Sequence, residues 1–391
     1  MFNIKQITFF LLIFTTLNCS KKTVTPTPID PIPVVPTTKG YTWDKFSMGA
    51  DLSYVNEIQD AGGIYKDSNV VKDPFVIFKN HGTNTVRVRL WHNPTWKLAT
   101  SNNKLYSDLY DVEKTIKRAK AAGMAVNLDI HYSDDWADPQ KQEIPVAWKN
   151  CTATTIKDSV YNYTLSVLNY LKSKNLTPEM VQIGNENNNG MAHPFGKPVN
   201  NSYKNFGDLV NAGIKAVRDF SLNSTIKPQI IIHVAQLQNG EWWMNSVTAG
   251  GITDFDIIGL SHYAKWSTVA TMEGVGTVIK TLKTKYNKKV MIVETAFPWT
   301  TQNADSYTNI IGEGVGTYGV SQTEHLRYMK DLTQSVISAG GTGIMYWEPA
   351  WITSPMKDRW GSGSSWENNA YFDFTGNALP IFDWMIFDYK F

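Results

Sequence analysis

The chain has 391 residues, of which 42% are hydrophobic and 18% are charged, and its formal net charge is only +2. This composition allows a large buried core and gives no sign of a nucleic-acid partner. The 14 tryptophans and 18 tyrosines stand out more than the charge does. Their flat rings can stack on sugar rings, although aromatic residues are equally common in protein cores.

Residues 1–19 resemble a targeting segment. Lys5 precedes an apolar run at residues 7–17, which is too short to span a bilayer as a mature helix. The run ends just before Cys19, so the segment is similar to a bacterial lipoprotein signal whose cysteine carries the lipid. Asn18 departs from the small residue that usually precedes such a cysteine, and cleavage at another site is the alternative. We therefore expect an exported protein, anchored through Cys19 to the outer membrane of a Gram-negative bacterium, on the cell surface or the periplasmic face.

Residues 20–40 are rich in threonine and proline, a composition typical of an extended spacer without a core. Residues 41–391 are interpreted as one domain, because the sequence shows no repeat and no second domain. Besides Cys19, only Cys151 could react as a thiol, so no disulfide is expected. A nucleophilic role for Cys151 is the alternative, but no histidine is adjacent to it.

Strand-like and helix-like segments alternate after residue 41, as in an α/β fold. The eight expected strands are Met48–Leu52, Thr85–Leu90, Ala125–Ile130, Met180–Ile183, Gln229–Val234, Asp256–Leu260, Lys289–Val293 and Gly343–Tyr346. The helical patterns between them include Asp111–Ala122, Ser159–Lys172, Phe206–Phe220, Gly274–Lys285 and Glu324–Ala339. Eight such units predict a single (β/α)8 TIM barrel. A doubly wound open sheet is the competing fold, but no glycine-rich phosphate loop follows the first strand.

Polar or aromatic residues follow nearly every expected strand. Glu186 lies just beyond one strand, and Glu294 directly follows another. Because all strands of a parallel barrel point the same way, residues at their carboxyl ends converge on one face, where catalytic groups are found. The two strand-end glutamates therefore indicate a single site.

Two carboxyl groups can cleave a glycosidic bond when one protonates the leaving oxygen and the other, ionised, attacks the anomeric carbon or activates water. Glu186 and Glu294 supply such a pair. A separation of about 5–5.5 Å implies retention and roughly 6.5–9.5 Å implies inversion, and the residues alone leave both open. Asn185 could hydrogen-bond the sugar 2-hydroxyl, whereas the alternative is that Asn185 and Glu186 only cap the next helix.

Arg87 and Arg89 alternate with valines, so both side chains point to one face of their strand. A guanidinium beside a nucleophilic glutamate would keep that carboxylate ionised, and a structural ion pair is the alternative. His131, His233 and His262 lie at three strand ends, but their spacing matches no metal-binding motif. We interpret these histidines as hydrogen-bonding residues that orient the site.

Tryptophans near the strand ends are candidate platforms for sugar rings, although each could equally belong to the core. They are Trp91, Trp136, Trp299, Trp347, Trp351 and Trp366. Glu348 also follows a strand, but Pro349 and the flanking tryptophans favour a packed platform over a catalytic role.

Taken in order, these motifs resemble the endo-β-1,4-galactanases of glycoside hydrolase family 53. The matching segments within residues 43–391 are 49–53, 85–89, 129–139, 181–186, 189–191, 293–295, 346–351, 366–370 and 372–374. The resemblance implies a retaining (β/α)8 enzyme with Glu186 as acid/base and Glu294 as nucleophile. It also implies cleavage of β-1,4 bonds in galactan and type I arabinogalactan side chains of pectin. Residues 187–188 and 261–263 depart from the family pattern, and both stretches lie near the expected cleft.

The polysaccharide is expected to contact residues at the strand ends. These residues are Asp51, Arg89, His131, Trp136, Asn185, His262, Tyr263, Trp347 and Trp351. Some bacterial members of the family hold calcium between the loops after the last two strands. Here Asp305, Asn309 and Asp358 offer oxygens of the kind that calcium takes, and a solvated polar loop is the alternative. The expected chemistry requires no cofactor.

Two other functions compete with galactan cleavage. A related barrel hydrolase could act on another β-1,4-glycan such as mannan or xylan, because a glutamate pair does not encode the sugar. A non-catalytic, surface glycan-binding lipoprotein could keep the barrel and its aromatic cleft, but binding alone would not need both glutamates. We expect a monomer whose partners are a polysaccharide and, through the lipid, a membrane.

Overall fold

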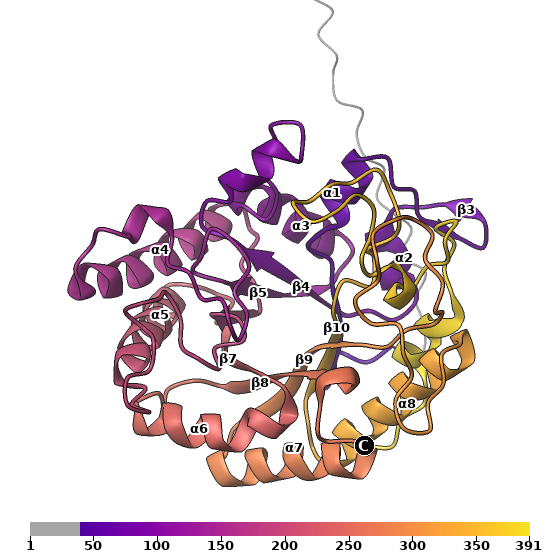
Figure 1. Ribbon diagram of the computed structural model, residues 1–391. Helices are drawn as coiled ribbons and strands as arrows, with labels where there is room; N and C mark the ends of the chain where they lie inside the picture. Colours follow the sequence, from indigo (N-terminus) through magenta and orange to yellow (C-terminus); the bar gives the residue numbers. More distant parts are fainter. Residues whose placement is uncertain (1–39) are drawn as a thin grey trace, which may run out of the picture. The chain divides into compact units, whose positions relative to one another are not determined.

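The computed structural model describes residues 40–391, with eight parallel strands at their centre (Figure 1). In order around the ring these are β1 (Ser47–Asp51), β10 (Gly343–Tyr346), β9 (Lys289–Ala296), β8 (Ile257–Tyr263), β7 (Gln229–Ala235), β6 (Met180–Ile183), β5 (Ala125–Ile130) and β4 (Thr85–Leu90). Parallel pairing of β1 with β4 closes the ring. The closed barrel confirms the expected (β/α)8 fold and excludes the open, doubly wound sheet. The expected signal segment, and all of the expected linker except Gly40, lie outside the described residues.

Strands β8 and β9 run further than their apolar patterns indicate. The expected ends were Leu260 and Val293, but the ladder continues with Ser261 beside Glu294, after a register shift at Leu260. It ends where Tyr263 pairs with Ala296. Glu294 is therefore part of a strand rather than of the loop that follows, and its backbone is held on the rigid barrel.

The α-helices in residues 40–391 lie around the barrel (Figure 1). They are α1 (Val55–Asp60), α2 (Pro74–Asn80), α3 (Leu109–Ala121), α4 (Ala153–Ser173), α5 (Lys204–Leu222), α6 (Gly240–Ala249), α7 (Met272–Tyr286) and α8 (Gln322–Ser338). The expected helical segments fall on α3, α4, α5, α7 and α8. Asp108, Thr152, Thr271 and Ser321 cap α3, α4, α7 and α8 by accepting a backbone N–H of the first turn.

The last unit of the barrel departs from the regular pattern. After β10, residues 347–391 form no α-helix, and a 3-10 segment at Pro380–Ile386 packs against α8 in its place. The first unit carries a small hairpin of β2 (Lys66–Asp67) and β3 (Val70–Val71) between α1 and α2. Among the described helices, none is both long and apolar enough to cross a membrane.

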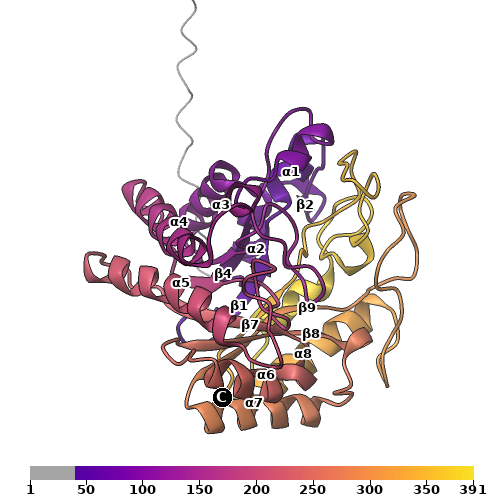
Figure 2. The ribbon, with the colours of Figure 1, turned by 60° about the vertical axis from the view of Figure 1, so that its left-hand side comes forward.

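Two long loops, which follow β9 and β10, rise on the same side of the molecule (Figure 2). Backbone and amide hydrogen bonds join them. The backbone N–H of Trp299 donates to the Asn368 carbonyl at 2.8 Å, and the Asn368 amide donates to the Ile311 carbonyl at 2.6 Å. The loops therefore form one connected wall above the barrel.

Candidate active site

A cavity of about 950 Å³ lies at the carboxyl ends of the strands and is bounded partly by the two long loops. The expected catalytic and substrate-binding residues that line it are Arg89, His131, Trp136, Asn185, Glu186, Tyr263, Glu294, Trp347 and Trp351, and Asp358 of the expected calcium site lines it as well. The catalytic and substrate-binding residues come from separate strands across the whole chain. The barrel brings them together as the strand-end argument predicts.

Glu186 and Glu294 are the central pair. One carboxylate oxygen of Glu186 lies within 4.8 Å of one of Glu294. This approach of two oxygens is compatible with retention, for which the two carboxyl groups lie about 5–5.5 Å apart. Glu294 belongs to β9 and is only 5% exposed. Glu186 follows β6 and has a φ of +46°, a left-handed conformation that is rare for residues other than glycine and is typical of functional sites.

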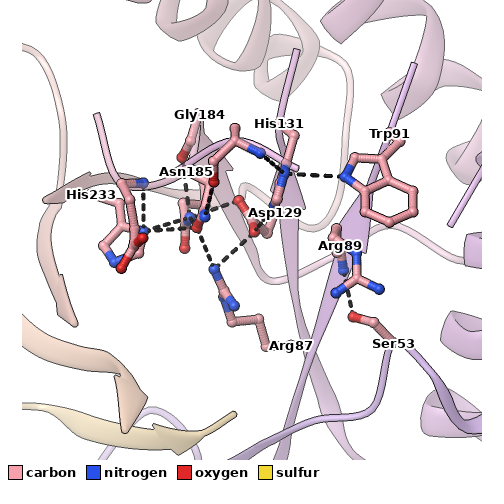
Figure 3. A network of polar contacts seen from close by, with 12 residues as sticks. Ser53, Arg87, Arg89, Trp91, Asp129, His131, Gly184, Asn185 and His233 are labelled. Atoms are coloured by element: carbon pink, nitrogen blue, oxygen red, sulfur yellow. Dashed lines mark hydrogen bonds and ion pairs between the residues drawn. The ribbon is translucent and has the colours of Figure 1, made fainter. Parts of the chain in front are cut away.

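Arg87, on β4, holds three carboxylates at the base of the cavity. Its Nη1 lies 2.8 Å from Asp51 Oδ2, and its Nη2 lies 2.8 Å from both Asp129 Oδ2 and Glu294 Oε1. Burial alone would lower the pKa of Arg87, but Asp129, Glu294 and Asp51 together raise it. Figure 3 shows its guanidinium pointing at Asp129 and Asn185. Arg87 is therefore both a buried ion-pair partner and the cation beside Glu294, so the two sequence interpretations hold at once.

The two glutamates differ in their electrostatic surroundings. Burial raises the pKa of Glu186 well above its usual value, and the charge of Glu294 raises it further, against a hydrogen bond from Ser261. Burial also raises the pKa of Glu294, but Arg87 and a hydrogen bond from Tyr263 oppose this rise. Tyr263 donates to Glu294 Oε2 at 2.8 Å. Glu186 is thus the member of the pair that keeps a proton, and Glu294 is the member that ionises.

His131 is fixed on both sides of its ring. Its Nε2 lies 3.0 Å from Asp129 Oδ2, and its Nδ1 accepts the indole N–H of Trp91 at 3.3 Å (Figure 3). The same Nδ1 lies 3.2 Å from the backbone nitrogen of Ala137. These contacts fit an orienting role for His131.

His233, on β7, also has partners for both ring nitrogens. Nδ1 accepts the backbone N–H of Glu186 at 3.1 Å, and Nε2 lies 2.9 Å from Ser261 Oγ. In residues 40–391, Glu186, His233 and Glu294 form the one group of three acidic or histidine side chains close enough to share a metal ion. Because hydrogen bonds occupy the His233 ring, this group is organised for hydrogen bonding rather than for metal binding.

Arg89 is held among aromatic rings. Its guanidinium lies 4.1 Å from the ring centre of Trp136 and 4.7 Å from that of Tyr54. Glu348, which is fully buried, lies 3.3 Å from Arg89 Nη1 and accepts the backbone N–H of Tyr54 at 3.3 Å. Glu348 does not line the cavity, and its contacts fit the packed platform that the sequence indicated. Arg89 connects this platform to Trp136.

Four of the six candidate tryptophan platforms line the cavity, namely Trp136, Trp347, Trp351 and Trp366. Trp347 and Trp366 pack edge to face with ring centres 4.7 Å apart. The other two do not reach the cavity lining. Trp91 is buried and hydrogen-bonds His131, and the Trp299 indole donates to the Glu367 carbonyl at 3.1 Å.

Asp51 and His262 do not line the cavity, contrary to the expectation that they contact substrate. Asp51 is fully buried beneath Arg87, so it can act on the site only through that arginine. His262 lies between Ser261 and Tyr263 on β8, and neighbouring strand residues point to opposite faces. Since Tyr263 faces the cavity, His262 faces away, and burial lowers its pKa to about 4. Cys151 also lies outside the cavity lining, just before α4.

The two aspartates expected to bind calcium already accept hydrogen bonds from the protein. Asp305 Oδ1 accepts the backbone N–H of Tyr307 at 2.8 Å, and Oδ2 accepts that of Ser364 at 2.9 Å. Tyr307 also donates from its hydroxyl to Asp358 Oδ2 at 3.0 Å, so it stands between the two carboxylates. Asn309 donates from Nδ2 to Asn303 Oδ1, and its own Oδ1 is buried without a hydrogen-bond partner in residues 40–391. Within the described part of the chain, only Asn309 among the three offers an oxygen without a protein donor, and one such oxygen does not make the set of six to eight ligands that calcium takes.

The sequence interpretation missed several site residues. Ser261 donates to Glu186 Oε1 at 2.6 Å. Its position two residues before Tyr263 on one strand was the signal that could have found it, because such residues share a face. Gln236, Trp266, Ile310 and Trp360 also line the cavity, from loops that carry no periodic pattern.

Comparisons with known proteins agree with this site. The model of glycosyl hydrolase family 53 matches residues 47–385. The arabinogalactan endo-beta-1,4-galactanase of Cellvibrio japonicus is 44% identical over 352 residues, which cover 88% of this chain and 92% of that protein. Arabinogalactan endo-beta-1,4-galactanase A of Emericella nidulans is 36% identical over 341 residues, which cover 85% of this chain and 91% of that protein.

Two sets of solved structures are similar along most of the chain. The Ignisphaera aggregans GH53 catalytic domain has a TM-score of 0.80 and 34% identity, and the match covers 93% of this chain and all of that one. A structure of fungal beta-1,4-galactanases has a TM-score of 0.73 and 30% identity, and covers 86% of this chain and 98% of that one. The family match spans the whole barrel, including both glutamates. The chain therefore belongs to glycosyl hydrolase family 53.

Proposed function

We propose that this protein is an arabinogalactan endo-β-1,4-galactanase that cleaves β-1,4-galactosidic bonds with retention of anomeric configuration. The observation that carries the proposal is the pair of half-buried Glu186 and buried Glu294 in the cavity of a family 53 barrel. Relatives at 44% and 36% identity bear this enzyme name, and family 53 is a retaining family. One oxygen of each carboxyl group lies within 4.8 Å of the other, which is compatible with the same stereochemistry.

In this mechanism Glu294 attacks the anomeric carbon while Glu186 protonates the oxygen of the departing chain. The glycosidic bond breaks and a galactosyl ester forms on Glu294. Glu186, now ionised, then takes a proton from water, whose oxygen attacks the same carbon and releases Glu294. The contacts of Arg87 and Tyr263 with Glu294 support its role as the ionised group, and the raised pKa of Glu186 supports its role as the acid.

Binding of a polymer is supported by the size and lining of the cavity. Its volume of about 950 Å³ is at the upper end of the range for small-ligand sites. Trp136, Trp347 and Trp351 present rings to it, and Trp360 and Trp266 lie at more exposed positions of the lining. We assign these tryptophans to the binding of successive sugar units, with Arg89, His131 and Asn185 as polar contacts close to the two glutamates.

The two alternatives predict different results with the same protein. A hydrolase of mannan or xylan would have the same glutamate pair, since the pair does not encode the sugar. A glycan-binding protein without activity would not need an ionised carboxylate, Glu294, beside a carboxyl group that keeps its proton, Glu186. The electrostatic difference between Glu186 and Glu294 therefore favours an enzyme.

Product analysis tests the proposal directly. The domain lacking residues 1–39 is incubated with linear β-1,4-galactan, and with mannan and xylan as parallel samples. Short galacto-oligosaccharides from galactan alone are expected, with the β-anomer appearing first by proton NMR. Products from mannan or xylan would establish the related hydrolase. Binding of galactan by a folded protein without any product would establish the non-catalytic alternative.

We also propose that the protein is exported and anchored through a lipid on Cys19, and that it acts as a monomer. The lipoprotein-like segment at residues 1–19 and the spacer at residues 20–40 support the anchor. Labelling of cells with a radioactive fatty acid should mark the wild-type chain and not Cys19→Ala. Protease accessibility of intact cells then separates surface display from the periplasmic face, and light scattering of the soluble domain measures its mass.

A further inference from the structure

A closed ring of hydrogen bonds begins and ends on Glu186. The backbone N–H of Glu186 donates to His233 Nδ1 at 3.1 Å. His233 Nε2 lies 2.9 Å from Ser261 Oγ, and Ser261 Oγ donates to Glu186 Oε1 at 2.6 Å. The ring thus joins the backbone of the proposed acid to its own carboxyl group through two other strands, β7 and β8.

The partners of His233 fix the position of its proton. The backbone N–H of Glu186, a donor whose direction is fixed, points at Nδ1 at 3.1 Å, and Gln182 Nε2 lies 3.1 Å from the same nitrogen, so Nδ1 offers its lone pair. Asn185 Oδ1 lies 3.0 Å from Nδ1 but already accepts a hydrogen bond from Arg87 Nη2 at 2.8 Å. Burial lowers the pKa of His233 well below its usual value, and the charge of Arg87 lowers it further, so the ring is neutral. The single ring proton of a neutral imidazole then lies on Nε2 and points at Ser261 Oγ.

The direction of the remaining bond follows from this tautomer. Ser261 has one hydroxyl proton, and its oxygen accepts from His233 Nε2, so the hydroxyl proton goes to Glu186 Oε1. In a protonated carboxyl group the carbonyl oxygen is the better acceptor, so the oxygen that accepts this hydrogen bond is the one without the acid proton. The proton of the Glu186 carboxyl group is therefore left on Oε2.

We propose that His233 is a positioning residue for the acid–base steps, because its tautomer directs the acid proton of Glu186 to Oε2. With the opposite tautomer, the Ser261 hydroxyl would donate to His233. The Glu186 carboxyl group could then donate its proton to Ser261 Oγ instead of to the glycosidic oxygen. His233 would also lose its hold on the backbone of Glu186, which lies in the left-handed region. This inference rests on the proposed function of Glu186.

Two variants divide the roles of the histidine ring. His233→Asn keeps an acceptor near Nδ1 and loses the donor to Ser261, whereas His233→Gln keeps a donor near Nε2 and loses the acceptor for the Glu186 N–H. Each should lower kcat on galactan by about 2- to 10-fold, the usual effect of one hydrogen bond, with little change in KM. Ser261→Ala provides the matched loss of the last bond in the ring.

The pH profile distinguishes positioning from a purely structural role. The alkaline limb of kcat/KM reports loss of the Glu186 proton. Ser261→Ala removes a hydrogen bond that favours ionised Glu186, so its limb should move to higher pH, by up to about one pH unit. His233→Asn should move the limb in the same direction, and His233→Gln should leave it in place. Lower activity with unmoved limbs in Ser261→Ala and His233→Asn would overturn the proposal.

A measurement on the folded protein separates this proposal from the proposed function. Nitrogen-15 NMR of histidine-labelled protein, assigned by comparison with His233→Gln, should show His233 neutral and protonated at Nε2 over the whole pH range in which the domain is folded. A ring protonated at Nδ1, or a charged ring near neutral pH, would overturn the inference even in a fully active galactanase. The expected NMR result in a protein without galactanase activity would leave the tautomer established and the proposed function refuted.

Discussion

Arg87 Nη2 lies 2.8 Å from Glu294 Oε1, and this contact crosses the mouth of the barrel. Strands β1 and β10 separate β4, which carries Arg87, from β9, which carries Glu294. The ionised state of the proposed nucleophile therefore depends on closure of the barrel and not only on a neighbouring residue. Asp51 and Asp129 share the same guanidinium and fix its position.

Replacing Arg87 by lysine should impair Glu294 as a nucleophile. Lysine keeps the charge but cannot contact Asp51, Asp129 and Glu294 at once, because its charge is a single ammonium group. We expect kcat/KM on galactan to fall by about 100-fold, as for the loss of one preorganised charge contact. The acidic limb of the pH profile should move to higher pH, because the pKa of Glu294 is no longer lowered by Arg87.

Arg87→Met serves as the companion variant. It leaves three buried carboxylates without their shared cation, so the free energy of unfolding in urea should fall by about 3–5 kcal/mol. An acidic limb that stays in place in Arg87→Lys, together with normal turnover, would show that Glu294 does not depend on this contact.

Glu294→Gln should abolish nearly all turnover and leave the fold intact. Glutamine has a similar shape but cannot form the glycosyl ester, and Arg87 keeps Asp51 and Asp129 as partners. Thermal unfolding should resemble that of the wild-type protein, and galactan should still bind.

Glu186→Gln is the matched control for Glu294→Gln. With an aryl galactoside whose leaving group needs no protonation, Glu186→Gln should still form the glycosyl enzyme and then stall. Azide, which attacks without a general base, should restore its turnover and give a β-galactosyl azide. Rescue of Glu294→Gln instead of Glu186→Gln would exchange the two roles.

Most of the barrel could be predicted because its strands are short apolar runs. Glu186 and Glu294 could be placed at one site because strand ends in a parallel barrel share a face. The prediction for His262 is wrong because the apolar pattern of β8 ends at Leu260, so the next residues are expected to form a loop, where side-chain direction is not fixed. In the structure β8 continues to Tyr263, and alternation turns His262 away from the cavity.

Contacts between distant segments could not be predicted from the sequence pattern. Ser261 and Glu186 lie on different strands, and the serine carries no motif of its own. Trp91 and Trp136 look alike in sequence, yet Trp91 is buried and Trp136 lines the cavity, because packing against neighbouring elements decides which ring reaches the surface.

Stability should fall as the pH rises from about 4.5 to about 7, with Glu367 as one cause. Burial, followed by the charge of Asp305, raises the pKa of Glu367 to about 7. Across this window the folded state keeps a proton that the unfolded chain has released, so folding is penalised as pH rises. Asp111, whose pKa is raised by burial to about 6, acts in the same direction. Glu367→Gln, which mimics the protonated form, should gain about 2 kcal/mol at about pH 8 and little at about pH 4.

The control for this prediction is Glu273→Gln, an exposed glutamate in the first turn of α7. Its urea unfolding should follow the wild-type protein at every pH. The contrary result is a free energy of unfolding of Glu367→Gln that falls as steeply with pH as that of the wild-type protein between about pH 4.5 and 7. That result would show that Glu367 is not the group that keeps a proton in the folded state.

Calcium should leave the thermal stability of the domain unchanged. A cation that binds only the folded state raises Tm with its concentration. Asp305 and Asp358 already accept hydrogen bonds from protein donors, and Tyr307 joins the two loops without a metal. Tm should therefore agree in excess EDTA and in excess calcium chloride. Tyr307→Phe loses the hydroxyl bond to Asp358 and should cost about 1 kcal/mol that calcium does not restore. A Tm that rises with calcium, and no longer does so in Asp305→Asn, would instead establish a calcium site between these loops.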